Sequence, residues 1–329
     1  MMDRRRFLLT SLAGAFAAPL AAGAQAGKVY RIGFLSAGSQ PTLENRQAFE
    51  HALRERGWVP GENLVIAYPF AEGKYDRLPA LAADLVRLKP RVIVAVPTVA
   101  ARAVRDATTT IPIVMLFVSD PIAEGLIASF ARPGGNVTGL TLTPTREIFA
   151  KQLQLLKEAV PRARRIAFLW NPANPTTTGP PAVRIVEEAA RSLGVGLQII
   201  GARAPEEFEP AFRAMTQARA DALLVLIDSM FFTHRARLAD LSGRDRLPTM
   251  YGAGEHAKAG GLMAYGVNLA DAYRRTAGYV DKLLRGANPA ELAVEQPTKV
   301  EFVIDLKTAK ALGLTIPPSL LARADQIIE

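Results

Sequence analysis

Cysteine is absent from this chain of 329 residues, and histidine occurs only three times. The lack of cysteine excludes disulfide bonds, thiolate metal sites, a cysteine nucleophile and a lipid anchor on an export-site cysteine. With so few histidines as well, the sequence predicts neither a bound metal ion nor a cofactor.

The motifs that usually carry enzyme chemistry are also missing. The segments 36–39 and 170–174, which follow two predicted strands, lack the glycine pattern of a dinucleotide site. Neither a phosphate-binding P-loop, a G-x-S-x-G elbow nor an H-E-x-x-H zinc motif occurs. Glu255 and His256 could form an acid/base pair, but adjacent polar residues in a loop more commonly meet solvent or a ligand. We therefore predict a binding protein and not an enzyme.

The charge of the chain is basic but dispersed. Lys and Arg number 40 against 31 Asp and Glu, which gives a formal net charge of +9. Because the basic residues are interspersed with acidic ones, they are typical of solvated helix faces and not of one basic surface. The sequence therefore does not predict nucleic-acid binding.

The N-terminal segment has the pattern of an export signal. Arg4 and Arg5 form a twin-arginine pair ahead of an apolar stretch at 7–23, and 24–26 (Ala-Gln-Ala) is a small-x-small cleavage site. An uncleaved membrane anchor is the alternative, but about 17 residues interrupted by glycine and proline are short for a span of roughly 20. We expect residues 1–26 to be a cleaved twin-arginine-type signal peptide that leaves a soluble mature chain.

The remaining sequence repeats one α/β pattern. An apolar strand is predicted at 30–36 and again at 166–170, and each is followed by helices and strands in matching order. Helices of 10 to 16 residues between strands are typical of right-handed βαβ units and parallel sheets. The fold class predicted is α/β, with two similar doubly wound parallel-sheet lobes. We expect the first lobe to span 28–143 plus about 266–295, and the second 144–265 plus about 296–329.

Two segments at the margins of this pattern are predicted to be helical. One is a short helix at 122–130, and the other is a final helix at 319–328 after the rigid Ile-Pro-Pro turn. The C-terminal residues are expected to add a piece to each lobe, so that the chain crosses between the lobes more than once and forms a hinge.

Ligands of parallel α/β sheets bind at the carboxyl ends of the strands. The residues at these ends are mostly small, polar or carboxylate-bearing, and some also precede or open helices, where a cap contributes about 1 kcal/mol. For each of these residues, the sequence is compatible with a helix cap and with a contact to the ligand. The ligand-binding candidates are Ser36, Thr98, Asp120, Asn171, Asn174, Asp228, Tyr251 and Glu255.

Asp228 is the most informative candidate, because it follows the apolar run 222–227. A carboxylate is costly to desolvate there unless it is paired, and a ligand cation would provide the pair; a helix cap is the alternative. The helix after Thr98 would favour a carboxylate, and Tyr251 and Trp170 would supply a flat apolar surface. Together these groups indicate a zwitterion with an apolar or aromatic side chain.

Several longer motifs resemble one known family. They are AEGKYDRLPALAA (71–83), ARPGGNVTG (131–139), WNPANP (170–175), QPTKVEF (296–302) and LKTAKALGLTIPPSLL (306–321). Over roughly 28–329 the chain is similar to the ABC transporter substrate-binding proteins that include tryptophan- and tyrosine-binding members. The resemblance implies a type I periplasmic-binding-protein fold, export to the periplasm and delivery of a small solute to a membrane permease. Where relatives commonly have a glycine pair before Thr-Pro, this chain has Val96-Pro97-Thr98, and Pro97 has no N–H group to donate.

The function predicted is therefore that of an exported, monomeric solute-binding component of an ABC importer. Two alternatives stay open: an exported sensory binding protein that serves a signalling partner, and an exported α/β enzyme.

Overall fold

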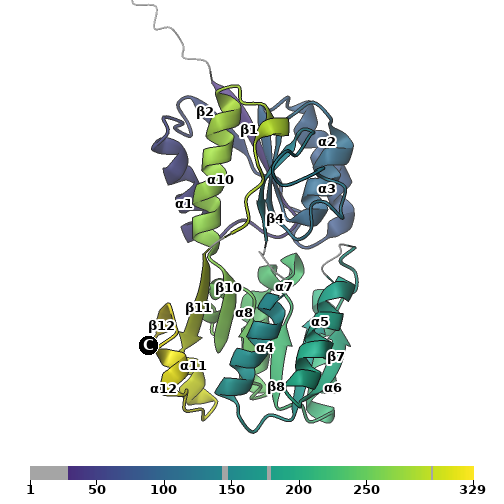
Figure 1. Ribbon diagram of the computed structural model, residues 1–329, viewed down its shortest axis with the longest axis vertical. Coiled ribbons are helices and arrows are strands. Elements are labelled where there is room, and N and C mark those ends of the chain that lie inside the picture. Colours follow the sequence, from purple (N-terminus) through teal and green to yellow (C-terminus); the bar gives the residue numbers. More distant parts are fainter. Residues whose placement is uncertain (1–28, 143–146, 176–178, 298) are drawn as a thin grey trace, which may run out of the picture.

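The computed structural model describes residues 29–142, 147–175, 179–297 and 299–329. Two α/β lobes are stacked along the long axis of the molecule, and Figure 1 shows the first sheet above and the second below. The predicted fold class is confirmed. The predicted signal peptide lies outside the described residues.

The sheet of the first lobe has five parallel strands in the order β2-β1-β3-β4-β5. Its central strands are continuous apolar runs, so consecutive side chains are buried on opposite faces. Phe34 packs under α1 and α10 and its neighbour Leu35 under α2 and α3. The elements are β1 (Tyr30–Ser36), α1 (Leu43–Arg54), β2 (Leu64–Ala67), α2 (Leu78–Arg87), β3 (Val92–Val96), α3 (Thr98–Ala107), β4 (Ile113–Val118), β5 (Val137–Thr141) and α10 (Leu269–Leu284).

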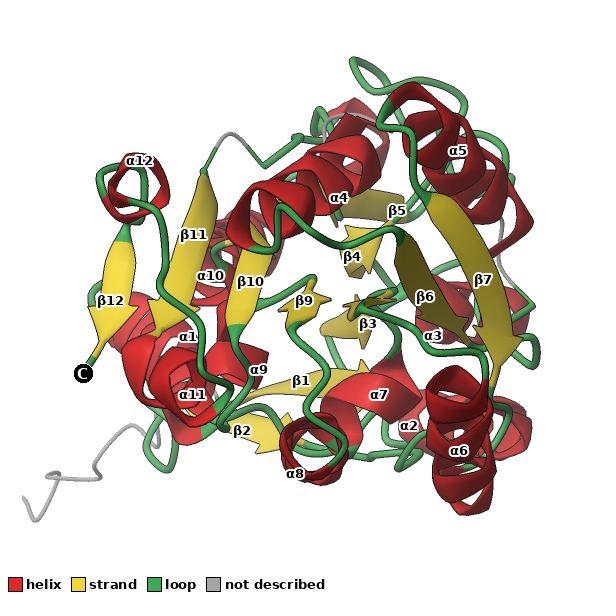
Figure 2. Cartoon of the chain, turned by 90° about the horizontal axis from the view of Figure 1, so that it is seen from below, coloured by secondary structure: helices red, strands yellow, loops and turns green. Residues whose placement is uncertain are grey.

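The sheet of the second lobe has seven strands in the order β12-β11-β10-β9-β8-β6-β7. Only the pairing of β10 with β11 is antiparallel. Helices α4 and α5 cover one face and α6 and α8 the other, as Figure 2 shows from below. The elements are α4 (Glu147–Ala159), β6 (Arg165–Trp170), α5 (Gly179–Ser192), β7 (Gly196–Gly201), α6 (Phe208–Gln217), β8 (Ala222–Val225), α7 (Ser229–Thr233), α8 (Arg235–Arg244), β9 (Thr249–Tyr251), α9 (Gly254–Lys258), β10 (Met263–Val267), β11 (Val300–Asp305), α11 (Leu306–Ala311), α12 (Pro318–Leu321) and β12 (Gln326–Ile328).

The chain passes between the two sheets three times. It leaves the first sheet after β5, returns between β10 and α10, and leaves again between Glu295 and β11. Before this last passage, Leu140 and Glu295 form a β-bridge at the edge of the first sheet. A chain that changes sheets a few times permits rotation of one lobe against the other through a few backbone angles.

Two local predictions are wrong. Residues 122–130 form turns instead of a helix, because Gly125 has a φ of +65° and breaks the helical hydrogen-bond pattern. The predicted final helix ends early as α12, and the following residues form β12, which pairs with β11. There Asp325 accepts a hydrogen bond from the backbone N–H of Phe302, so pairing with an available strand overrides local helix propensity.

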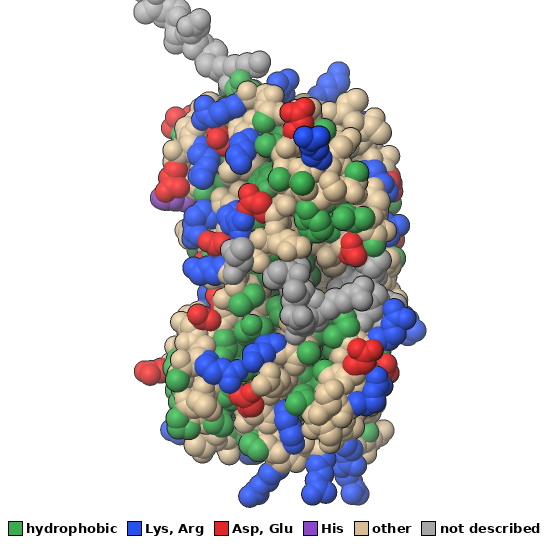
Figure 3. Space-filling view, in the orientation of Figure 1, with side chains coloured by type: hydrophobic (Ala, Val, Ile, Leu, Met, Phe, Trp, Pro, Cys, Tyr) green, Lys and Arg blue, Asp and Glu red, His purple; other side chains and the backbone are tan. Residues whose placement is uncertain are grey.

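Charged side chains are spread over both lobes. On the face shown in Figure 3, Lys and Arg lie among Asp, Glu and apolar side chains on each lobe. Among the helices that the structure describes, none is long and apolar enough to cross a membrane.

Candidate functional site

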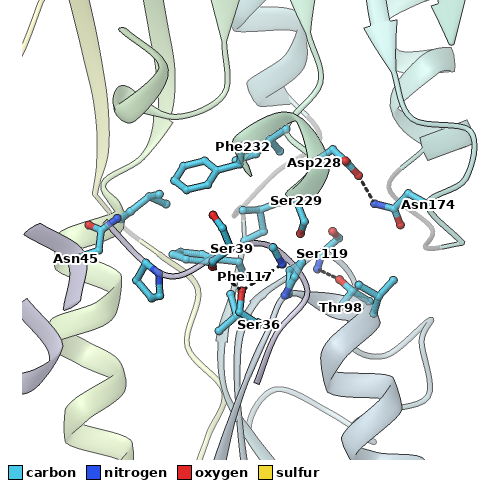
Figure 4. A pocket seen from close by; sticks show the side chains of 18 of the residues that line it. Ser36, Ser39, Asn45, Thr98, Phe117, Ser119, Asn174, Asp228, Ser229 and Phe232 are labelled. Carbon is cyan, nitrogen blue, oxygen red and sulfur yellow. Dashed lines mark hydrogen bonds between the residues drawn. The ribbon is translucent and has the colours of Figure 1, made fainter. Parts of the chain in front are cut away.

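A cavity lies between the lobes, at the carboxyl ends of strands from both sheets (Figure 4). It encloses about 820 Å³, including the space at its open mouth. Both lobes contribute side chains, so a ligand in this cavity would contact each of them.

The apolar wall contains three aromatic rings beside aliphatic side chains such as Val96, Ile227 and Leu269. Phe117 and Tyr273 come from the first lobe and Phe232 from the second. Phe117 has a φ of +60°, and the pairing of β4 with β5 is irregular between Met115 and Val118. A phenylalanine rarely adopts this backbone conformation, which costs on the order of 1 to 3 kcal/mol, and such residues concentrate at binding sites. The Phe117 ring meets Tyr273 edge-on, with a centroid distance of 5.9 Å.

Small hydroxyl groups line the wall of the first lobe. Ser36 Oγ accepts a hydrogen bond of 3.2 Å from the N–H of Gly38, and Thr98 Oγ1 accepts one of 3.2 Å from the N–H of Ser119. Thr98 is the first residue of α3, and Pro97 occupies the cap position. The hydroxyls therefore hold the loops in place, while the positive end of the α3 dipole lies at the cavity wall.

Asp228 is surrounded by four neutral donors. Its Oδ1 accepts from Asn171 Nδ2 at 3.1 Å and from the N–H of Met230 at 2.9 Å. Its Oδ2 accepts from Asn174 Nδ2 at 2.8 Å and from the hydroxyl of Tyr75 at 2.7 Å. The bond from Met230 caps α7, so the capping alternative for Asp228 is confirmed. Asp228 also lines the cavity, and the four bonds support its charge without neutralising it.

Contacts of several kinds join the lobes around the cavity. Besides the Tyr75 hydroxyl, the N–H of Ser39 donates to Thr233 Oγ1 at 3.1 Å, and Lys258 forms a 2.7 Å ion pair with Glu44. Burial raises the pKa of Tyr75, and neighbouring Asp228 raises it further, so this hydroxyl keeps its proton and remains a donor. The described conformation is therefore one in which the lobes touch.

The described lining of the cavity has one charged side chain. Among the described residues that line it, Asp228 is the only carboxylate, and none is a lysine, arginine or histidine. Nor do the described residues form any group of three or more His, Cys, Asp and Glu side chains able to hold a metal ion.

The structure brings half of the predicted residues to the cavity. Those that line it are Ser36, Thr98, Asn174 and Asp228; those that do not are Asp120, Asn171, Tyr251 and Glu255. Asp120 instead holds a turn, accepting from the N–H of Ala123 at 3.0 Å.

Tyr251 belongs to the core of the second lobe. It is fully buried, its hydroxyl lies 3.1 Å from Ser242 Oγ, and its ring stacks on His256. Trp170 packs against the other core of that lobe. The flat apolar surface expected from Tyr251 and Trp170 is supplied instead by the phenylalanines and by Tyr273.

Sequence reasoning missed the cavity residues Asn45, Phe117, Phe232 and Tyr273, and the contact of Tyr75 with Asp228. The four cavity residues lie in or beside stretches with ordinary strand or helix patterning, and Tyr75 opens a 3-10 turn. When one segment supplies residues to both the core and the cavity, its pattern of apolar and polar residues does not show which side chains face the cavity.

Two α/β lobes with parallel sheets, three connections and a cavity between them define the type I periplasmic-binding-protein fold. The chain belongs to the ABC transporter substrate-binding protein family, whose model matches residues 32–328.

Solved structures similar to this chain have the same arrangement. A conserved domain protein of Vibrio cholerae O1 biovar El Tor is 28% identical, with a TM-score of 0.81 over 91% of this chain and 100% of that one. An ABC domain of Streptococcus pneumoniae in complex with L-Trp is 25% identical, with a TM-score of 0.80 over 92% of this chain and 100% of that one. A tyrosine-binding protein of Clostridioides difficile is 24% identical over 87% of this chain and 82% of its own length.

Proposed function

We propose that this chain is the solute-binding component of an ABC importer and that it binds an amino acid with an aromatic or large apolar side chain. The observation that carries the proposal is the composition of the described cavity lining, which combines rings from both lobes with one carboxylate and no basic side chain among the described residues. The names of the similar proteins, tyrosine-binding and L-Trp-bound, support the same class of solute.

Each part of such a solute has a counterpart in the cavity. The ring of the solute fits among Phe117, Phe232 and Tyr273. Its ammonium is attracted by the negative charge of Asp228, and its carboxylate by the N-terminus of α3 at Thr98. Ser36 and Asn174 line the polar part of the cavity.

The proposal includes a cellular route. Residues 1–26 direct the chain through the twin-arginine pathway, and the mature monomer works in the periplasm. There the lobes close over the solute, and the closed form delivers it to a membrane permease.

Calorimetric and thermal-shift titration of the mature chain tests the proposal. L-tryptophan, L-tyrosine and L-phenylalanine are compared with tryptamine, which lacks the carboxylate, and with indole-3-propionate, which lacks the ammonium. We expect the amino acids to bind and to stabilise the fold by about 2.7 kcal/mol at 100 times Kd, and the two analogues to bind at least about tenfold more weakly. Binding of a sugar without binding of any amino acid would contradict the proposed solute class.

A further inference from the structure

Beside the cavity, a further polar contact joins the lobes, where Asn45 of α1 meets Glu255 of α9. Asn45 Nδ2 donates a hydrogen bond of 2.8 Å to Glu255 Oε1. Asn45 is 1% exposed and Glu255 7%, so the contact is shielded from water. Asn45 also lines the cavity, which places this contact at the cavity wall.

The contact leaves two acceptor atoms without a hydrogen bond. Asn45 Oδ1 and Glu255 Oε2 are both buried, and neither has a partner among the described residues. Both atoms can only accept while Glu255 is ionised, so they cannot bond to each other. A single proton on Oε2 turns it into a donor, and a carboxylic acid can pair with a carboxamide through two hydrogen bonds.

We propose that Asn45 and Glu255 form a proton-binding site that operates together with the solute cavity. Glu255 takes up one proton from solvent as the lobes close; its Oε2–H then donates to Asn45 Oδ1 while Asn45 Nδ2 donates to Oε1. This inference rests on the proposed function, because it requires that the solute is bound by closure of the lobes.

The surroundings of Glu255 favour the protonated form. Burial raises the pKa of its carboxyl group, and the negative charge of Glu44 on α1 acts in the same direction. The hydrogen bond from Asn45, the backbone N–H of Glu255 itself and the charge of Lys258 on α9 lower the pKa, but burial is the larger influence. Lys258 is also paired with Glu44, which reduces its effect on Glu255.

The other elements packed around this contact add no positive charge. Glu301 on β11 is a second acidic neighbour, and its own pKa is raised by burial and by Glu255. Tyr273 on α10 keeps its proton, because burial raises its pKa. His256 on α9 stays neutral, since burial lowers its pKa to about 3. Closing the lobes around an ionised Glu255 would thus bury a negative charge with an incomplete set of partners.

Proton uptake makes solute binding depend on pH. In the open form Glu255 meets water and titrates in the range of an ordinary glutamate. Because closure raises this pKa, affinity is highest below the ordinary value and falls as pH rises through the raised one. Between the two values the slope approaches a tenfold loss of affinity per pH unit, which corresponds to one proton per solute.

Calorimetric titration of the mature chain with L-tryptophan between pH 5 and 8, in buffers of different ionisation enthalpy, tests the proposal. We expect affinity to fall with rising pH and up to one proton to be taken up per L-tryptophan. Glu255→Gln carries an NH2 donor in place of the acid proton, so we expect its affinity to vary less than about twofold over this range. Glu301→Gln is the matched control and should keep the slope, with its midpoint moved to lower pH because an acidic neighbour of Glu255 is removed. A flat wild-type profile, a slope retained in Glu255→Gln, or a slope lost in Glu301→Gln would overturn the proposal.

A second measurement tests the proton-binding site without a solute, in case the proposed class of solute is wrong. Failure of L-tryptophan and L-tyrosine to bind at any pH would contradict the proposed function alone. The solute-free chain is then studied by solution scattering between pH 5 and 8. Protonation of Glu255 favours the closed form, in which its pKa is raised, so we expect the radius of gyration of the wild type to increase as pH rises relative to that of Glu255→Gln. Parallel radii over this pH range would overturn the inference.

Discussion

The hydroxyl of Tyr75 donates a 2.7 Å hydrogen bond to Oδ2 of Asp228, and the two residues belong to different lobes. Tyr75 opens a 3-10 turn next to α2, while Asp228 caps α7. Because Asp228 also lines the cavity, one carboxylate connects the solute site to the contact that holds the lobes together. Opening the lobes must break this bond, so its strength contributes to the affinity for solute.

Tyr75→Phe removes only this interlobe hydrogen bond. We expect affinity for the amino acid to fall by about 1.5 to 3 kcal/mol, the usual range for a hydrogen bond to a charged group. The loss should appear mainly as faster dissociation in stopped-flow measurements. Tyr68→Phe is the control, because the Tyr68 hydroxyl bonds to Glu50 within the first lobe. Equal dissociation rates for the two variants would contradict a role of Tyr75 in closure.

Asp228→Asn separates the charge of this residue from its capping role. Asparagine caps helices about as well as aspartate, so α7 keeps its cap while the cavity loses its negative charge. We expect the affinity for L-tryptophan to fall by about 1.5 to 3 kcal/mol, against about 1 kcal/mol for Thr98→Ala. The affinity for indole-3-propionate, which has no ammonium, should fall much less. An equal loss for both compounds in calorimetry would show that Asp228 acts by holding the loops.

Phe232→Ala tests the apolar wall. The ring lines the cavity and is only partly buried, so its removal should not collapse either core. We expect affinity for aromatic amino acids to fall by about 1.5 to 3 kcal/mol, the transfer free energy of one large apolar side chain. Phe232→Leu, which keeps most of the apolar volume of the side chain, should recover part of the lost affinity. Unchanged calorimetric affinity in Phe232→Ala would place the solute elsewhere.

Solution scattering measures the closure of the lobes. If solute binding closes them, the radius of gyration of the mature chain decreases at saturating L-tryptophan. Thr233→Val removes the acceptor for the Ser39 N–H, which is a contact between the lobes. We expect this variant to show a larger radius without solute and to need more solute for compaction. Binding without any change in radius would contradict the closing motion.

Changing both Arg4 and Arg5 to lysine tests the export signal. We expect the precursor to accumulate in the cytoplasm of a bacterium whose twin-arginine pathway exports the wild type. Immunoblots of periplasmic and cytoplasmic fractions give the answer, with a pathway-deficient strain as control. Undiminished secretion of the double variant would assign export to the general route.

The two-lobed α/β fold could be predicted from the sequence, because buried parallel strands are continuous apolar runs between amphipathic helices. The repeat of this pattern at 30–36 and 166–170 is local and therefore visible in one dimension. The position of the polar strand ends at the cavity follows from the same rule, which is why Ser36, Thr98 and Asp228 were found.

The tertiary structure alone decided the rest of the site. Asn45 and Glu255 are far apart in sequence. Only the packing of α1 against α9 brings them within hydrogen-bond distance and buries both side chains. Tyr251 resembles a cavity residue in the sequence, but it lies in the core, because the ring of a strand residue can pack inward while the next loop turns outward. The composition of a segment is local, whereas the burial of a side chain depends on residues that only folding brings close.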